Sequence, residues 1–127
     1  MARRGLPIAR GVAGLLALFM AAYFATDNFG GDSVLRLDNL FLVPDLLIVV
    51  LLATAAALPA RFARPALTFS LAWSAAVWTV SLSQWVVADQ VGRGLGHLIL
   101  ILPAVIAAGL AAGSPPADVS PEMTRLK

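Results

Sequence analysis

The sequence contains no cysteine, a single histidine and few charged residues. Without cysteine, the chain has no disulfide framework, no thiolate nucleophile and no thiolate metal site. Charged residues make up 13% of the 127 positions, whereas soluble domains carry about 25%. Hydrophobic residues account for 60% of the chain, and the mean hydropathy is +0.87. This composition predicts an integral membrane protein rather than a soluble domain.

The basic residues do not indicate nucleic-acid binding, although the pI is 9.9. The formal net charge is only +2, and the basic residues lie at the edges of apolar segments rather than on one polar face. Eight of the nine basic residues are arginine. This bias and the abundance of alanine are typical of a high-GC bacterial genome. We therefore expect the partner to be the lipid bilayer of a bacterial inner membrane, and no nucleic acid.

Four apolar segments are each long enough to cross a bilayer as a helix, since a hydrocarbon layer about 30 Å thick needs roughly 20 helical residues. They occupy residues 6–25, 40–60, 65–88 and 95–113. The short linkers between them favour an up-down, all-α bundle of four transmembrane helices over residues 1–113. Residues 114–127 are rich in proline and polar side chains, which predicts a flexible tail.

The distribution of Lys and Arg predicts how the bundle is oriented, because cytoplasmic segments retain positive charge. One side of the membrane receives Arg3, Arg4, Arg10, Arg61, Arg64, Arg125 and Lys127. The other side receives Arg36 and Arg93, together with Asp27, Asp32, Asp38 and Asp89. Both termini are therefore expected in the cytoplasm and the first loop outside.

The first 25 residues also fit a secretory signal peptide, with a basic start followed by an apolar run. A signal peptide would end in a small-x-small cleavage site, but Tyr23 occupies the position of the first small residue. We therefore interpret this segment as a retained helix.

Small residues recur at helical spacing in the first and fourth segments. In lipid, helices associate through close backbone approach and polar contacts rather than through the hydrophobic effect. The candidate packing residues are Ala9, Ala13, Ala17, Ala21 and Ala25 in the first segment, and Gly109 and Gly113 in the fourth. Their number exceeds the need of one bundle, which favours contact with other membrane-protein subunits or a homo-oligomer.

Asp45, Gln84 and His97 are expected at similar depth in the outer leaflet, on three different helices. A carboxylate inside a span is costly and is by default a functional candidate. Two interpretations of Asp45 stay open. Behind Pro44 it fits the first turn of a helix, which a negative charge stabilises; alternatively, it pairs with His97 or binds a proton, a cation or a headgroup.

The third segment carries serines and tryptophans in a helical pattern. Ser70, Ser74 and Ser81 fall within about 40° of one another around a helix, with Trp78 close to the same side. The hydroxyls are expected to bond carbonyls one turn earlier or a neighbouring helix, while Trp85 anchors at the outer interface. The alternative is a polar stripe that lines a cavity, with Trp73 and Trp78 as aromatic ligand walls.

No metal or cofactor site is predicted. His97 alone cannot supply both axial ligands of a b-type haem, and no cluster of carboxylates or thiolates accompanies it. Asp45, His97 and Ser83 lack the GxSxG motif of a hydrolase. We therefore expect a protein that is not an enzyme; an enzyme subunit with a quinone or haem wall formed by Trp73, Trp78 and His97 is the least favoured alternative.

The plan of four spans is similar to that of several bacterial membrane families, without a shared motif. The first span lacks the glutamate of small multidrug-resistance exporters. Thr68 to Ser70 resembles a fragment of a fluoride-channel motif, but the Asn-bearing segment of those channels is absent. DoxX-like and polyprenyl-sugar flippase-like proteins share only the architecture. The favoured hypothesis is an accessory or structural subunit of a respiratory or cell-envelope complex. The alternative is a small transporter, or a lipid-linked-sugar flippase component, with an outward-facing site around Asp45.

Overall fold

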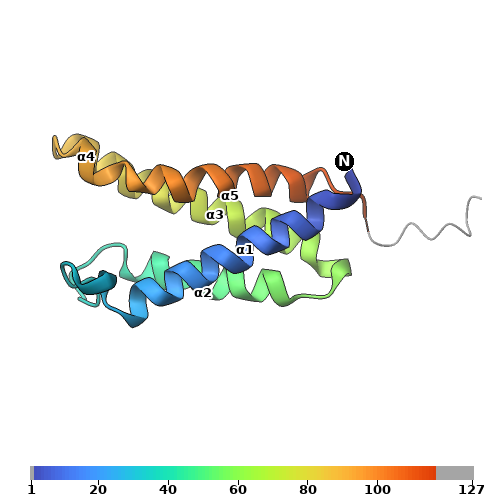
Figure 1. Ribbon diagram of the computed structural model, residues 1–127, viewed down its shortest axis with the longest axis horizontal. Coiled ribbons are helices and arrows are strands. Elements are labelled where there is room, and N and C mark those ends of the chain that lie inside the picture. The colour runs from blue at the N-terminus through green and yellow to red at the C-terminus, as the bar shows by residue number, and fades with distance from the viewer. Residues whose placement is uncertain (1, 117–127) are drawn as a thin grey trace, which may run out of the picture.

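The chain folds into a bundle of helices, and the computed structural model describes residues 2–116 (Figure 1). The elements are α1 (Ala2–Ala25), the 3-10 turn η1 (Asn28–Gly30), α2 (Leu42–Ala57), α3 (Ala60–Val87), the short α4 (Val91–Gly94) and α5 (Gly96–Ala112). No strand occurs within the described residues. The predicted all-helical fold is thus confirmed for this part of the chain, while residues 117–127 of the predicted tail lie outside it.

Consecutive long helices run in opposite directions and enclose one core, as Figure 1 shows. Helix α1 begins at the end of the bundle where α2 is followed by α3 and where α5 ends. We call this the entry end. The opposite end carries the long loop of residues 26–41 and the α4 turn, and we call it the loop end. Two helices, α1 from Arg4 onward and α3, are long and apolar enough to cross a membrane, whereas α2 and α5 are shorter apolar helices.

Small residues let the helices approach closely at the entry end. Gly5 is buried, and a Cβ at this position would lie 2.8 Å from the backbone oxygen of Leu110 and 2.9 Å from Ser114 Oγ. The buried residues around it are mostly alanines. They include Ala9, Ala13, Ala55, Ala63, Ala104, Ala107 and Ala111. Only glycine and alanine leave room for such short helix separations.

The candidate packing residues divide into two groups in the structure. Ala9, Ala13 and Ala17 of the first segment are buried in the core. Ala21, Ala25, Gly109 and Gly113 are exposed, and a Cβ at Gly109 would meet no atom within 4 Å. The four exposed residues lie outside the helix interfaces of this chain, because the core side of each helix turns away from them.

Several helix boundaries differ from the predicted ones. Helix α3 begins at Ala60, directly after Pro59 in an extended conformation with ψ 152°, so residues 61–64 are helical rather than a linker. Pro65 therefore sits inside the helix, where it removes a single backbone hydrogen bond. Helix α2 begins at Leu42 and carries Asp45 in its first turn, as the helix-start interpretation of Asp45 predicts.

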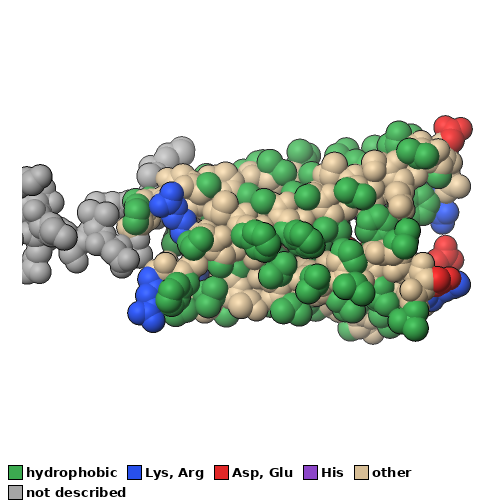
Figure 2. All heavy atoms as spheres, turned by 180° about the vertical axis from the view of Figure 1, so that it is seen from behind, with side chains coloured by type: hydrophobic (Ala, Val, Ile, Leu, Met, Phe, Trp, Pro, Cys, Tyr) green, Lys and Arg blue, Asp and Glu red, His purple; other side chains and the backbone are tan. Residues whose placement is uncertain are grey.

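Opposite charges gather at the two ends of the bundle (Figure 2). Arginine side chains cap carbonyls at the entry end: Arg10 Nη1 donates to the Ala56 oxygen at 3.0 Å, and Arg64 Nη2 to the Ala112 oxygen at 2.8 Å. Both carbonyls lie in the last turn of a helix, where no backbone partner is left for them. The acidic residues within residues 2–116 all lie toward the loop end, beside Arg36 and Arg93.

Candidate ligand-binding cavity

A cavity of about 630 Å³ lies at the loop end of the bundle. Its size falls in the range of roughly 300–1,000 Å³ that is usual for small-molecule sites. Helices α1, α2, α3 and α5, the α4 turn and the loop of residues 26–41 all contribute to it. The lining residues are Phe19, Met20, Tyr23, Asn28, Phe29, Asp32, Ser33, Val34, Asn39, Phe41, Asp45, Trp78, Ser81, Gln84, Trp85, Arg93, Gly96, His97 and Leu100. Aromatic rings therefore form much of the wall.

The loop that covers the cavity is held by its own side chains. Asp27 Oδ1 accepts hydrogen bonds from the backbone N–H groups of Val34 at 2.9 Å and Leu35 at 3.4 Å. Asn39 donates from Nδ2 to the Val34 oxygen at 2.9 Å and accepts from the Phe41 N–H at 3.1 Å. The hydrogen bonds to Asp27, from the Ser33 side chain first and then from the loop backbone, lower the pKa of its carboxyl.

The loop begins with a run of left-handed backbone. Asp27, Asn28 and Phe29 have φ values of 46°, 63° and 51°. Asp and Asn tolerate this region, whereas for phenylalanine it is an outlier that stores strain. The Phe29 ring lies 5.7 Å from the ring of Phe19 and 6.2 Å from that of Tyr23. These aromatic contacts offset the strain and fasten the loop to α1.

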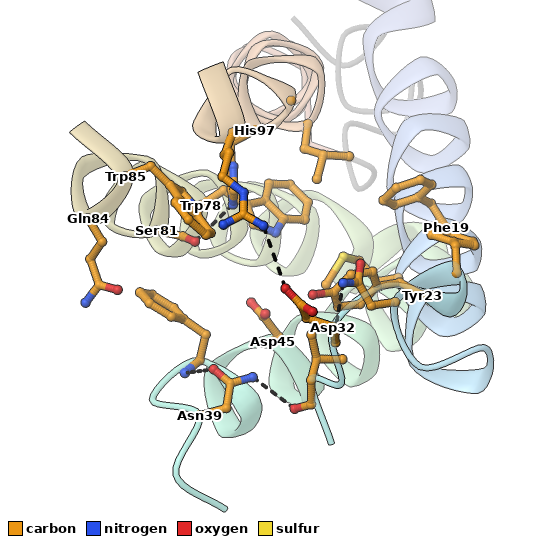
Figure 3. Close-up of a pocket in the computed structure, with 18 of the residues that line it drawn as sticks. Phe19, Tyr23, Asp32, Asn39, Asp45, Trp78, Ser81, Gln84, Trp85 and His97 are labelled. Carbon is orange, nitrogen blue, oxygen red and sulfur yellow. Dashed lines mark hydrogen bonds and ion pairs between the residues drawn. The ribbon is translucent and has the colours of Figure 1, made fainter. Parts of the chain in front are cut away.

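An arginine from α4 reaches across the mouth of the cavity toward the loop. Arg93 Nη2 lies 3.7 Å from Asp32 Oδ2, a contact drawn in Figure 3. The guanidinium carbon also lies 5.1 Å from the centroid of the Trp85 ring, and Nη1 donates to Gln90 Oε1 at 3.2 Å. The positive charge of Arg93 is therefore already engaged by three neighbouring side chains.

Both ring nitrogens of His97 are occupied within the protein. Nδ1 lies 2.9 Å from the Gly94 oxygen, and Nε2 lies 2.9 Å from Ser81 Oγ. A carbonyl only accepts, so Nδ1 carries the proton of the neutral imidazole, and Nε2 accepts the hydroxyl hydrogen of Ser81. His97 thus joins α5 to α3. It is not paired with Asp45, the partner considered from the sequence.

Asp45 points into the cavity from the first turn of α2 (Figure 3). Its backbone N–H donates to the Phe41 oxygen at 2.9 Å. Its carboxylate is half-buried and has no hydrogen-bond or ion-pair partner among residues 2–116. The hydroxyl of Tyr23, which also lines the cavity, has no hydrogen-bond partner in that part of the chain either. The positive end of α2 stabilises the carboxylate but leaves its oxygens free for another donor.

The residues singled out in the sequence meet only in part. Asp45, His97, Gln84 and Trp78 all line the cavity, although Gln84 is exposed and its side chain points away from the centre in Figure 3. Trp73 does not line it. It is 38% exposed and stacks on Phe69 with ring centroids 6.3 Å apart, because five helical residues turn it about 140° away from Trp78.

Sequence reasoning missed Tyr23, Ser81 as the partner of His97, and the loop residues that cover the cavity. Ser83, named with His97 in the sequence, is exposed and donates to the Val80 oxygen at 2.7 Å. The helical spacing of Ser81 and Trp78 was the available signal, since it places both on one side of α3. No comparable periodicity marks the loop.

No group of three or more potential metal ligands occurs within the described residues. Comparison of the chain with protein-family models, curated proteins and solved structures finds no match.

Proposed function

We propose that this chain is a bacterial inner-membrane protein of four transmembrane helices, with both termini in the cytoplasm and the cavity facing outward. The arginines at the entry end and the acidic residues at the loop end support this orientation. Helices α2 and α5 have 16 and 17 residues, about 25 Å at 1.5 Å per residue. Local thinning of the bilayer accommodates that length. Leu37 and Leu40, 100% and 78% exposed, then lie at the outer interface.

The cavity supports a ligand-binding role in this membrane protein, as a small transporter or as a flippase component. The observation that carries the proposal is the cavity of about 630 Å³, lined by all four long helices and containing a carboxylate with no partner among residues 2–116. A space of this size between the helices gives a small molecule room to bind.

Topology is tested with single cysteines, since the natural chain has none. In intact cells, Leu37→Cys in the loop is expected to react with a membrane-impermeant maleimide. Ala60→Cys at the entry end is expected to react only after permeabilisation. The reverse pattern would overturn the proposed orientation.

The cavity is tested by filling it. A Cβ at Gly96, which lines the cavity, would meet no atom within 4 Å, so Gly96→Leu is chosen to fill part of the space. The wild-type protein, purified in mild detergent, is expected to carry a bound small molecule in native mass spectra. Gly96→Leu is expected to lose it, while Gly92→Leu, in the same end of the bundle but outside the cavity, keeps it.

Reactivity of Ser81→Cys with a polar thiol reagent gives a second readout that needs no bound molecule. It is expected to fall in the Gly96→Leu background and to persist in the Gly92→Leu background. A wild-type protein without ligand, together with an unreactive Ser81→Cys, would remove the basis for a binding function.

The second candidate is an accessory or structural subunit of a larger membrane complex. Small residues that are exposed on the surface of this chain favour it: Ala21, Ala25, Gly109 and Gly113. In this case Gly109→Leu is expected to release a co-purifying partner in mild detergent, with the cavity unaffected. A protein that runs as a lone monomer at native expression, with no partner, would rule this candidate out.

A further inference from the structure

The polar groups around the cavity differ in whether their hydrogen-bonding capacity is already used. Arg93 contacts Asp32, Trp85 and Gln90. His97 uses both ring nitrogens within the protein. Asn39 uses its amide to hold the loop. Among the charged side chains that line the cavity, the Asp45 carboxylate is the one with no partner in residues 2–116. Within residues 2–116, the cavity therefore offers a ligand a negatively charged hydrogen-bond acceptor that is unoccupied, and no unpaired cationic side chain lines it.

The wall around this carboxylate is aromatic. Tyr23 and Trp78 line the same space, Tyr23 half-buried and Trp78 only 2% exposed, and both are labelled around the cavity in Figure 3. Aromatic faces attract cations through the ring quadrupole, and the attraction is largest where water is displaced. A carboxylate in a cavity with aromatic residues in its wall is a combination that suits organic ammonium groups.

We infer that the cavity binds an organic cation, with the positive group against the Asp45 carboxylate and its apolar substituents against the exposed part of the aromatic wall, which includes the ring of Tyr23. This inference rests on the proposed binding function and specifies its ligand. A bare metal ion fits less well. Calcium takes six to eight oxygen ligands and magnesium six, whereas no cluster of three or more potential ligands occurs in the described residues. An organic cation needs only one carboxylate, because its apolar substituents pack against the cavity wall and require no further charged ligands.

The test compares two probes of nearly the same shape and opposite charge, tetraphenylphosphonium and tetraphenylborate. Binding to the full chain in a non-ionic detergent is measured by equilibrium dialysis. Tetraphenylphosphonium is expected to bind at least about tenfold more tightly than tetraphenylborate. Millimolar Ca²⁺ or Mg²⁺ is expected to leave this binding unchanged.

The variants separate the carboxylate from general effects of charge. Asp45→Asn is expected to weaken tetraphenylphosphonium binding by about tenfold or more, while Asp45→Glu keeps it within a few fold. Asp89→Asn is the matched control. Asp89 is exposed at the same end, does not line the cavity, and has φ 57°, a conformation that asparagine tolerates. The Asp89→Asn variant is expected to bind tetraphenylphosphonium as tightly as the wild type does.

Folding is checked for each variant by gel filtration and thermal unfolding, because Asp45 also lies at the positive end of α2. If Asp45→Asn does not fold, the comparison rests on Asp45→Glu and on Gly96→Leu, which is expected to abolish binding.

Short-chain phosphatidylcholine and phosphatidylglycerol then identify the source of the cation. Competition by the choline lipid alone indicates a lipid headgroup, and competition by neither lipid indicates a free organic cation.

Two results would overturn the assignment. One is that tetraphenylborate binds the wild-type protein as tightly as tetraphenylphosphonium or more tightly, while the Gly96→Leu variant still loses the bound molecule. The cavity would then bind ligands, but not cations. The other is unchanged tetraphenylphosphonium binding in folded Asp45→Asn. Failure of the binding function itself is recognised separately, by a wild-type protein without bound ligand and an unreactive Ser81→Cys.

Discussion

The two ends of this bundle are built from the same four long helices, yet one end is closed and the other is hollow. At the entry end glycine and alanine are frequent among the buried residues, and arginines bind carbonyls in the last turns of α2 and α5. At the loop end the inward residues are large and aromatic, among them Met20, Tyr23 and Trp78. Small side chains let helices touch, whereas large ones hold them apart. The gradient of side-chain size between the two ends of the bundle thus accounts for where the cavity lies.

The largest expected effect comes from reversing this gradient at Gly5. Gly5→Leu forces a side chain against the Leu110 backbone, which lies 2.8 Å from the position of a Cβ. Overpacking of this kind costs about 3 kcal/mol. Gly11→Leu is the control, because a Cβ at Gly11 meets no atom within 4 Å. Thermal unfolding in detergent is expected to show a large loss of stability for Gly5→Leu and almost none for Gly11→Leu. Equal effects would mean that the entry end is not closely packed.

A smaller effect is expected where the entry end is fastened by arginine. Arg10→Met removes the hydrogen bond to the Ala56 oxygen and leaves a carbonyl in the last turn of α2 without its donor. The expected loss is about 1–2 kcal/mol in the free energy of unfolding. Arg64→Met removes the corresponding hydrogen bond to the Ala112 oxygen. Because that hydrogen bond is exposed to solvent, the loss of unfolding free energy is expected to be smaller than for Arg10→Met. A larger effect for Arg64→Met would contradict this order.

The loop end is expected to be the acid-sensitive part of the molecule. Hydrogen bonds from Ser33, Val34 and Leu35 lower the pKa of Asp27, so the folded loop favours the ionised carboxyl. This stabilisation is present above the ordinary pKa of about 4 for an aspartyl group and is lost as the pH falls through the lowered value. The protection factor of the Val34 amide in hydrogen exchange is expected to fall below about pH 4, with the helices of the entry end still protected. Asp27→Asn is expected to remove this pH dependence.

The smallest effect on stability is expected at the contact between Arg93 and Asp32. Their side chains are 61% and 95% exposed, and exposed pairs contribute about 0–1 kcal/mol. Arg93→Gln is therefore expected to leave the thermal unfolding midpoint almost unchanged. It frees the loop from α4, so a bound cation is expected to exchange a few times faster in stopped-flow measurements. Arg36→Gln, whose partner Asp38 lies outside the cavity, is expected to change neither property.

How much of this could be read from the sequence depends on whether a feature is periodic. Hydropathy predicted all four long helices, and the spacing of Ser81 and Trp78 placed them on one side of α3. Trp73 was grouped with Trp78 by depth alone, although the turn of the helix separates them. The loop of residues 26–41 has no repeating pattern. Its fold depends on left-handed residues and on side-chain contacts with α1 and α4, and so the sequence predicted neither the cover of the cavity nor the role of Tyr23.

The contact between Arg93 and Asp32 also has a consequence for cells in different media. At physiological salt the electrostatic screening length is about 8 Å, and it shortens to about 3 Å at 1 M. An ion pair between two water-exposed side chains at 3.7 Å is therefore weaker at high salt and stronger at low salt. In the proposed orientation this contact faces the external medium, so the salt concentration outside is expected to change its strength.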